Sequence, residues 1–129
     1  MAATQPEQVI EHFAKFFNSD DLDGLVEELY EDDAVLVPSP DSTATVAGKA
    51  AVREALQGFR NLGGTFVIIA ATAFTCGDIG LTHTHWRVEI PGGDPIEATT
   101  AEVVRRQADG SWKYAIDNPW DGALLTSTS

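Results

Sequence analysis

Two acidic residues in the last third of the chain have the type and setting that acid–base chemistry requires. Glu102 lies in the run ATTAEVVRR, in which alternate residues would share one face of a strand. On an interior face, apolar neighbours disfavour the ionised carboxylate and raise its pKa toward the range useful to a general acid or base. On an outer face, Glu102 would instead form a modest surface ion pair with Arg87 or Arg105. The sequence leaves both arrangements open.

The second candidate is Asp117, which begins the segment DNPWDG at the end of an expected strand. Because successive strand residues point to opposite faces, we expect one of Asp117 and Asn118 to face the interior. Trp120 could then cover a ligand with its indole, while a carboxylate or amide beneath it orients a carbonyl or hydroxyl group. The alternative is a strand end closed by an Asx turn, with Trp120 packed on the sheet.

Two histidines raise the question of a metal site. His83 and His85 would share one strand face with Glu89, which is a spacing that permits metal ligation. Arg87 stands between these side chains and repels a cation, and no cysteine or third histidine is nearby. We therefore expect no metal, and a half-exposed outer face suited to a dimer contact. The sequence also lacks a phosphate-binding glycine loop and a nucleophile elbow, so we expect neither phosphoryl transfer nor hydrolysis through a covalent enzyme intermediate.

The elements that position these residues fall into two halves. A Thr4 to Glu7 capping box with Pro6 in the first turn predicts a helix that continues through Phe17, and helical spacing recurs at 22–29 and 49–62. Short strands are expected at 34–37 and 43–47. The pattern then changes to period two and predicts long strands at 65–75, 80–90, 95–108 and 111–118, joined by hairpin turns. This order predicts an α+β fold with the helices on one face of a sheet.

Length and charge limit the classes of partner. The chain has 129 residues, enough for a single domain, which we place at 1–123 with a flexible tail at 124–129. A formal net charge of -12 with only eight Lys and Arg residues argues against nucleic acid and against an anionic membrane surface. No signal peptide or membrane span is evident, so we expect a cytoplasmic protein.

Three sequence motifs carry a family resemblance that covers nearly the whole chain. They are Leu29-Tyr30-x-Asp32-Asp33-Ala34, Gly48-Lys49-x-x-Val52-Arg53 and Asp109-Gly110-x-Trp112. In these motifs the chain resembles the nuclear transport factor 2-like superfamily, and within it the SnoaL-like, ketosteroid-isomerase-like and domain-of-unknown-function 4440 groups. The resemblance implies a cone-shaped, curved, mainly antiparallel sheet with three helices packed on its concave face, and a homodimer through the outer sheet face.

The resemblance also implies a ligand pocket inside the cone. Its ligand-binding residues are expected to be Phe13, Phe17, Tyr30, Phe59, Trp86, Asn118 and Trp120. The resemblance places three catalytic roles of ketosteroid isomerase on residues of this chain. Pro38 stands at the position of the general base, Phe13 at that of the oxyanion-hole tyrosine, and Glu102 at that of the oxyanion-hole acid. Two of these three groups are absent, so isomerisation by that mechanism is not expected.

Two functions from different classes remain open. The first is a pocket enzyme for a small apolar carbonyl or hydroxyl compound, with Glu102 and Asp117 as acid and base. It would be an isomerase, cyclase or dehydratase that needs no cofactor. The second is a non-catalytic ligand-binding or dimerisation module, which would account for Pro38 and Phe13. The fold alone does not separate them, because one fold hosts many functions.

Overall fold

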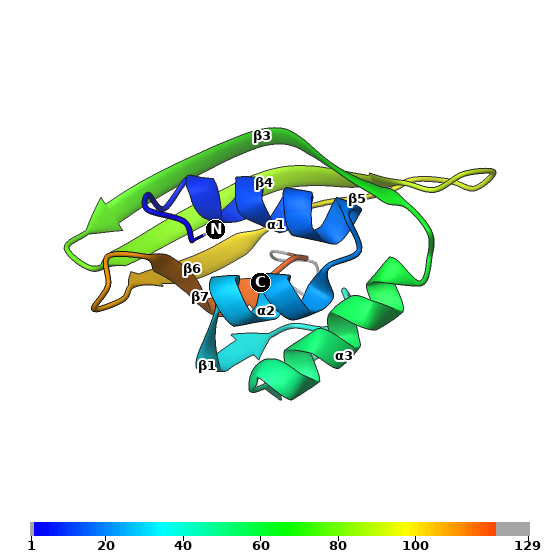
Figure 1. Ribbon diagram of the computed structural model, residues 1–129. Helices are drawn as coiled ribbons and strands as arrows, with labels where there is room; N and C mark the ends of the chain where they lie inside the picture. Colours follow the sequence, from blue (N-terminus) through cyan, green and yellow to red (C-terminus); the bar gives the residue numbers. More distant parts are fainter. Residues whose placement is uncertain (1, 121–129) are drawn as a thin grey trace, which may run out of the picture.

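The computed structural model describes residues 2–120 and contains three helices and a seven-stranded sheet (Figure 1). The expected tail at 124–129 and the last residues of the expected domain lie outside the described part. The helices are α1 (Gln8–Asn18), α2 (Leu22–Leu29) and α3 (Lys49–Arg60). The strands are β1 (Tyr30–Leu36), β2 (Val46–Ala47), β3 (Thr65–Cys76), β4 (Ile79–Glu89), β5 (Ile96–Thr99), β6 (Ala101–Arg106) and β7 (Trp112–Asn118).

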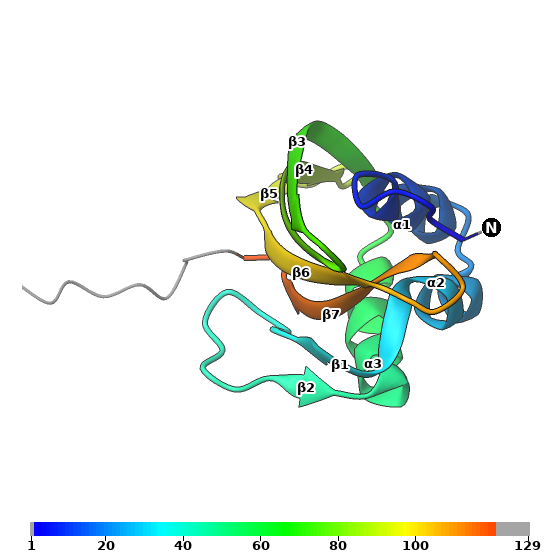
Figure 2. The same ribbon diagram turned by 90° about the vertical axis from the view of Figure 1, so that its left-hand side faces the viewer.

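The sheet is mixed but mostly antiparallel. Its strand order is β2-β1-β7-β6-β4-β3, and β5 also pairs with β4. Only the β1–β7 pairing among these is parallel. Figure 2 shows the sheet curling around the three helices, which lie on its concave side. The predicted α+β cone is thereby confirmed.

The alternation of β4 shows how the sequence divides the inside of the cone from the outside. Thr82, Thr84, Trp86 and Val88 are buried, while the residues between them are partly or largely exposed. The apolar stripe of α1, which includes Phe13, packs against the buried face of the sheet and buries hydrophobic area from both elements. The core therefore lies between the helices and the concave face of the sheet.

The capping box predicted at Thr4 to Glu7 is wrong. The helix begins at Gln8, after a tight turn in which the Gln8 amide donates to the Gln5 carbonyl at 3.1 Å. The amide and hydroxyl of Thr4 both donate to the Gln8 side-chain oxygen at 3.0 Å. Gln8 therefore takes the role expected of Glu7, one residue further along, and Glu7 makes no capping hydrogen bond.

The strand predicted at 95–108 is divided into β5 and β6 by Thr100. In a regular antiparallel pair, the Thr100 carbonyl would accept the Thr84 amide. The Thr100 hydroxyl accepts that amide instead, at 2.8 Å, and the Thr100 carbonyl oxygen lies 2.9 Å from His83 Nδ1. The Thr100 side chain thus competes with its own backbone and interrupts the strand.

In the described residues, no helix combines the length and apolar character needed to cross a membrane.

Candidate functional site

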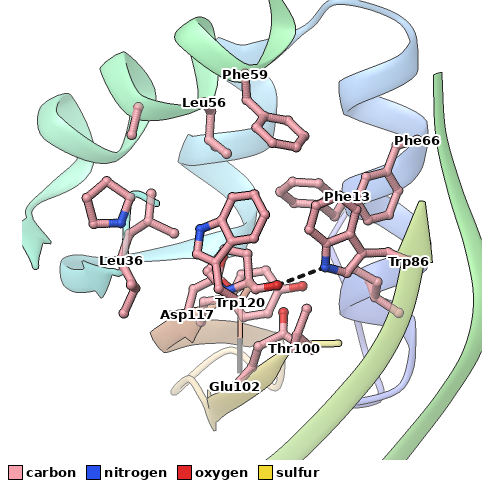
Figure 3. A pocket seen from close by; sticks show the side chains of 16 residues that line it. Phe13, Leu36, Leu56, Phe59, Phe66, Trp86, Thr100, Glu102, Asp117 and Trp120 are labelled. Atoms are coloured by element: carbon pink, nitrogen blue, oxygen red, sulfur yellow. Dashed lines mark hydrogen bonds between the residues drawn. The ribbon is translucent and has the colours of Figure 1, made fainter. Parts of the chain in front are cut away.

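A cavity opens inside the cone between α1, α3 and the concave face of the sheet. Aromatic and aliphatic side chains form most of its walls, and Glu102 and Asp117 are the acidic residues in its lining (Figure 3). The whole hollow with its open mouth encloses about 520 Å³, but water centres can occupy only about 50 Å³ of it. One water needs about 10–15 Å³ by the second measure, so the cavity is a narrow slot with room for a few waters.

Glu102 faces the interior of the cone and is only 2% exposed. Its Oε1 accepts hydrogen bonds from the Thr100 hydroxyl at 2.7 Å and from the Thr82 hydroxyl at 3.1 Å. The surface ion pair that the sequence left open is not formed. Arg87 pairs with Glu97 at 2.9 Å, and Arg105 with Glu31 at 3.0 Å.

Asp117 is the member of the Asp117–Asn118 pair that lines the cavity, and it is 4% exposed. It lies directly opposite Glu102 in the β6–β7 register. The hydroxyl of Tyr30, a fully buried residue, donates to Asp117 Oδ2 at 2.5 Å. Asn118 does not line the cavity; its Oδ1 accepts the Trp120 amide at 3.1 Å, which is the Asx turn that the sequence left open.

The two carboxyl groups hold protons more strongly than isolated ones. Burial, with the negative charge of Asp117 as the next cause, raises the pKa of Glu102 to about 8. Burial raises the pKa of Asp117 to about 6, although hydrogen bonds from Tyr30 and Glu102 oppose the rise. The pKa of Tyr30 is raised well above 10 by burial and by Asp117, so Tyr30 remains a hydrogen-bond donor. Two acids this close titrate as a pair, and near neutral pH the pair carries one proton.

Aromatic side chains cover the carboxyl pair. Trp120 meets Trp86 edge to face, with ring centroids 5.4 Å apart, and Phe59 in the same manner at 6.0 Å. The Trp86 indole N–H donates to the Pro119 carbonyl at 2.9 Å and holds the chain that carries Trp120 across the cavity (Figure 3). The indole nitrogen of Trp120 is buried and has no hydrogen-bond partner among the described residues.

Of the seven expected ligand-binding residues, four line the cavity and three do not. Phe13, Phe59, Trp86 and Trp120 line the cavity. Phe17 does not; it is fully buried behind Phe13, with ring centroids 5.8 Å apart. Tyr30 and Asn118 also lie outside the lining, although Tyr30 bonds directly to Asp117.

Tyr114 is a site residue that strict alternation along β7 conceals. Counting by twos from Asp117 places Tyr114 on the opposite face, yet both are buried and both line the cavity. A register shift between Val103 and Val104 of β6, opposite Ala115, reverses the alternation. Thr100 was detectable, because it lies two residues before Glu102 and shares its face.

The position where the resemblance places a catalytic base is apolar. Val37 and Pro38 both line the cavity, and neither carries an ionisable group. On the outer face, His83 contacts the Thr100 carbonyl and His85 lies 2.8 Å from Glu97. No group of three histidine, cysteine or acidic residues within 2–120 is arranged to hold a metal ion.

Comparison with known proteins identifies relatives by sequence and by fold. The sequence model of the SnoaL-like domain matches residues 9–115. No curated protein matches the chain at a significant level of sequence similarity. Among solved structures, a nuclear transport factor 2-like protein of unknown function from Pseudomonas putida is similar, with 21% identity and a TM-score of 0.71 over 87% of this chain and 80% of that one.

Two further structures bear the names of enzymes. A protein from Parabacteroides distasonis, provisionally named a ketosteroid isomerase, is 20% identical with a TM-score of 0.68 over 88% of this chain and 84% of that one. A protein from Novosphingobium aromaticivorans, provisionally named a scytalone dehydratase, is 13% identical with a TM-score of 0.70 over 87% of this chain and 78% of that one. At these identities the likeness shows the shared fold alone.

Proposed function

This chain belongs to the SnoaL-like domain family, and from that premise we propose that it is a cofactor-free pocket enzyme acting on a small apolar carbonyl or hydroxyl compound. The reaction class is isomerisation, cyclisation or dehydration by proton transfer. The names of the two similar structures, a ketosteroid isomerase and a scytalone dehydratase, fit this class.

The observation that carries the proposal is the buried pair of Glu102 and Asp117 beside an otherwise apolar cavity. One carboxyl that holds a proton and one that has lost it supply an acid and a base in the same site. A structural role alone rarely places two acids together away from water, because burial disfavours their charges.

The hydrogen bonds indicate which acid has which role. Asp117, stabilised as a carboxylate by Tyr30, is the base and removes a proton from carbon. Glu102 has the higher pKa and is the acid, which donates its proton to a carbonyl or leaving hydroxyl oxygen. In isomerisation both protons are returned within the cycle. In dehydration the protonated hydroxyl leaves as water, and the proton held by Asp117 then passes to Glu102, which restores the pair. Neither course consumes a cofactor.

The cavity walls restrict the ligand. Phe59, Trp86 and Trp120 favour a flat, apolar molecule that can lie between rings. The slot has little free volume, so the ligand is compact or enters with a movement of the Trp120 segment. A single oxygen facing the carboxyl pair provides the hydrogen-bonding partner for the two acids, and the Trp120 indole N–H, unpartnered in the described part of the chain, is a further donor in the walls.

A second candidate, a non-catalytic ligand-binding module, is favoured by two observations. Val37 and Pro38 replace a base expected in an enzyme of the ketosteroid isomerase type, and the free space is small. In that case the carboxyl pair would orient a bound oxygen without transferring a proton to carbon.

Deuterium exchange separates the two candidates. Compact cyclic ketones that bind are incubated with the protein in D₂O, and NMR follows exchange at the carbon next to the carbonyl. We expect exchange with the wild type, and a loss of about 10²-fold or more in Asp117→Asn. Glu54→Gln, which removes an exposed carboxylate of α3, is the matched control and keeps the wild-type rate. Binding with no exchange, or exchange unaffected in the Glu102→Gln, Asp117→Asn double variant, would reject the acid–base assignment.

A further inference from the structure

A second, smaller cavity lies between the start of α1 and the inner face of the sheet. Its lining includes Pro6 and Val9 on the helical side and Thr82, Thr84 and Tyr114 on the strand side. The volume that water centres can occupy there is about 10 Å³. This is at the lower limit of the space required by one water molecule.

Two hydroxyl groups in the lining have no partner. Thr84 and Tyr114 are each 1% exposed, and neither Thr84 Oγ1 nor Tyr114 Oη forms a hydrogen bond within the described residues. Buried polar groups are nearly always hydrogen-bonded, to protein or to ordered water. Both hydroxyls belong to residues that line one water-sized cavity, so a single water there can serve both of them.

We propose that this cavity is a binding site for one water molecule, held by Thr84 Oγ1 and Tyr114 Oη, which fixes the Tyr114 hydroxyl against Glu102. This site lies at the start of α1 and is separate from the ligand slot. Tyr114 lines both cavities, and in this proposal it acts on the reaction through Glu102, as a positioning residue.

The water would be connected to the carboxyl pair through two residues. The Thr82 hydroxyl donates to Glu102 at 3.1 Å, and Thr82 also lines the small cavity. Tyr114 lies close enough to Glu102 to lower its pKa, but its hydroxyl lacks the geometry of a fully formed hydrogen bond. A water on the far side of that hydroxyl supplies the partner that orients it.

The other ionisable groups around this connection are Asp117 and Tyr30 on the side of the ligand slot, and Glu7 at the edge of the small cavity. Glu7 is exposed, so the water lies next to a group in contact with solvent. The bound water is therefore expected to exchange with bulk solvent from the α1 side, even when a ligand occupies the slot.

Thr84→Val tests the site because it removes the hydroxyl while nearly preserving the side-chain shape. If the water is bound, the variant loses a hydrogen-bonded partner, and its Tm falls by about 3 °C or more. If no water is bound, the variant removes an unsatisfied buried hydroxyl, and its Tm stays the same or rises. That second result would overturn the proposal. Tyr114→Phe, combined with Thr84→Val, should lower Tm by less than the sum of the two single changes, because either change releases the water.

The proposed effect of the water on Glu102 is tested by the pKa of Glu102, a quantity that a change in packing alone does not shift. Carboxyl ¹³C NMR of the folded protein should show a higher Glu102 pKa in Tyr114→Phe, and a smaller increase in Thr84→Val. An unchanged pKa in Thr84→Val would overturn the positioning role. A high-resolution crystal structure should show a density peak within hydrogen-bonding distance of both oxygens. None of these measurements needs a substrate, so their failure leaves the proposed acid–base function standing.

Discussion

Glu102 and Asp117 lie opposite each other on β6 and β7, with both side chains on the concave face of the sheet. Within the described residues, neither forms an ion pair with a lysine, arginine or histidine, and the hydroxyl groups of Thr82, Thr100 and Tyr30 donate hydrogen bonds to them. Hydroxyl groups stabilise a negative charge less than a cation does. This environment therefore favours one shared proton over two charges.

The pair should make the protein less stable as the pH rises. The ordinary pKa values of 4.5 for Glu102 and 3.8 for Asp117 apply in the unfolded chain, whereas the folded values are about 8 and about 6. Between these limits the folded state holds more protons than the unfolded state, so the free energy of unfolding falls with increasing pH. We expect a loss on the order of 5 kcal/mol between pH 5 and 8.5 for the wild type. Denaturant unfolding at several pH values measures it.

Two variants test whether the carboxyl pair causes this dependence of stability on pH. Glu102→Gln removes the group with the higher pKa and should flatten most of the dependence above pH 6. Glu54→Gln, on the exposed side of α3, should keep the wild-type slope. Equal slopes in the wild type and Glu102→Gln would show that Glu102 titrates in its ordinary range.

Tyr30→Phe should weaken the ionised form of Asp117. The variant removes the hydrogen bond that lowers the pKa of Asp117, so that pKa should rise. Stability at pH 7 should fall by about 1–3 kcal/mol, because the charged carboxylate loses a buried partner. In a plot of reaction rate against pH, the low-pH limb should move to higher pH by the same amount as the pKa of Asp117. A fall in stability without movement of that limb would give Tyr30 a purely structural role.

Trp120 should control the affinity of the slot. Trp120→Ala removes the ring that packs on Phe59 and Trp86, and we expect Kd for a bound aromatic ketone to increase about 10-fold. Trp120→Phe retains a ring and should lose much less. Calorimetry measures both variants, and an unchanged Kd in Trp120→Ala would place the ligand elsewhere.

The outer face offers a surface for a second copy of the chain. Phe74, Leu81, Val103 and Ile116 are register neighbours across four strands, and three of them are at least 45% exposed. Six residues further along β4, Arg87 lies on the same face and forms an ion pair with Glu97, so that end of the face carries both charges. We propose a homodimer through this face and expect Leu81→Lys to convert it to monomer in sedimentation experiments. A wild type that is monomeric at micromolar concentrations would contradict this proposal.

The sequence predicted the parts of the site that follow regular periodicity. Alternation put Trp86 on one face of β4 with Thr82 and Thr84, and the family resemblance placed that face inside the cone. The same alternation put Glu102 on one face with Thr100. The sequence could not reveal the break at Thr100, because a side chain there replaces a backbone acceptor. Nor could it place Tyr114 and Asp117 on one face, because the register shift between β6 and β7 depends on the neighbouring strand.

The most direct test of the shared proton is a ¹³C NMR titration of the two side-chain carboxyl groups in the folded protein. We expect two steps that belong to the pair, near pH 6 and near pH 8, and a single step from Asp117 when Glu102 is replaced by Gln. If both carboxyls instead ionise below pH 5, no acid is held near neutral pH, and the proposed acid–base pair is contradicted.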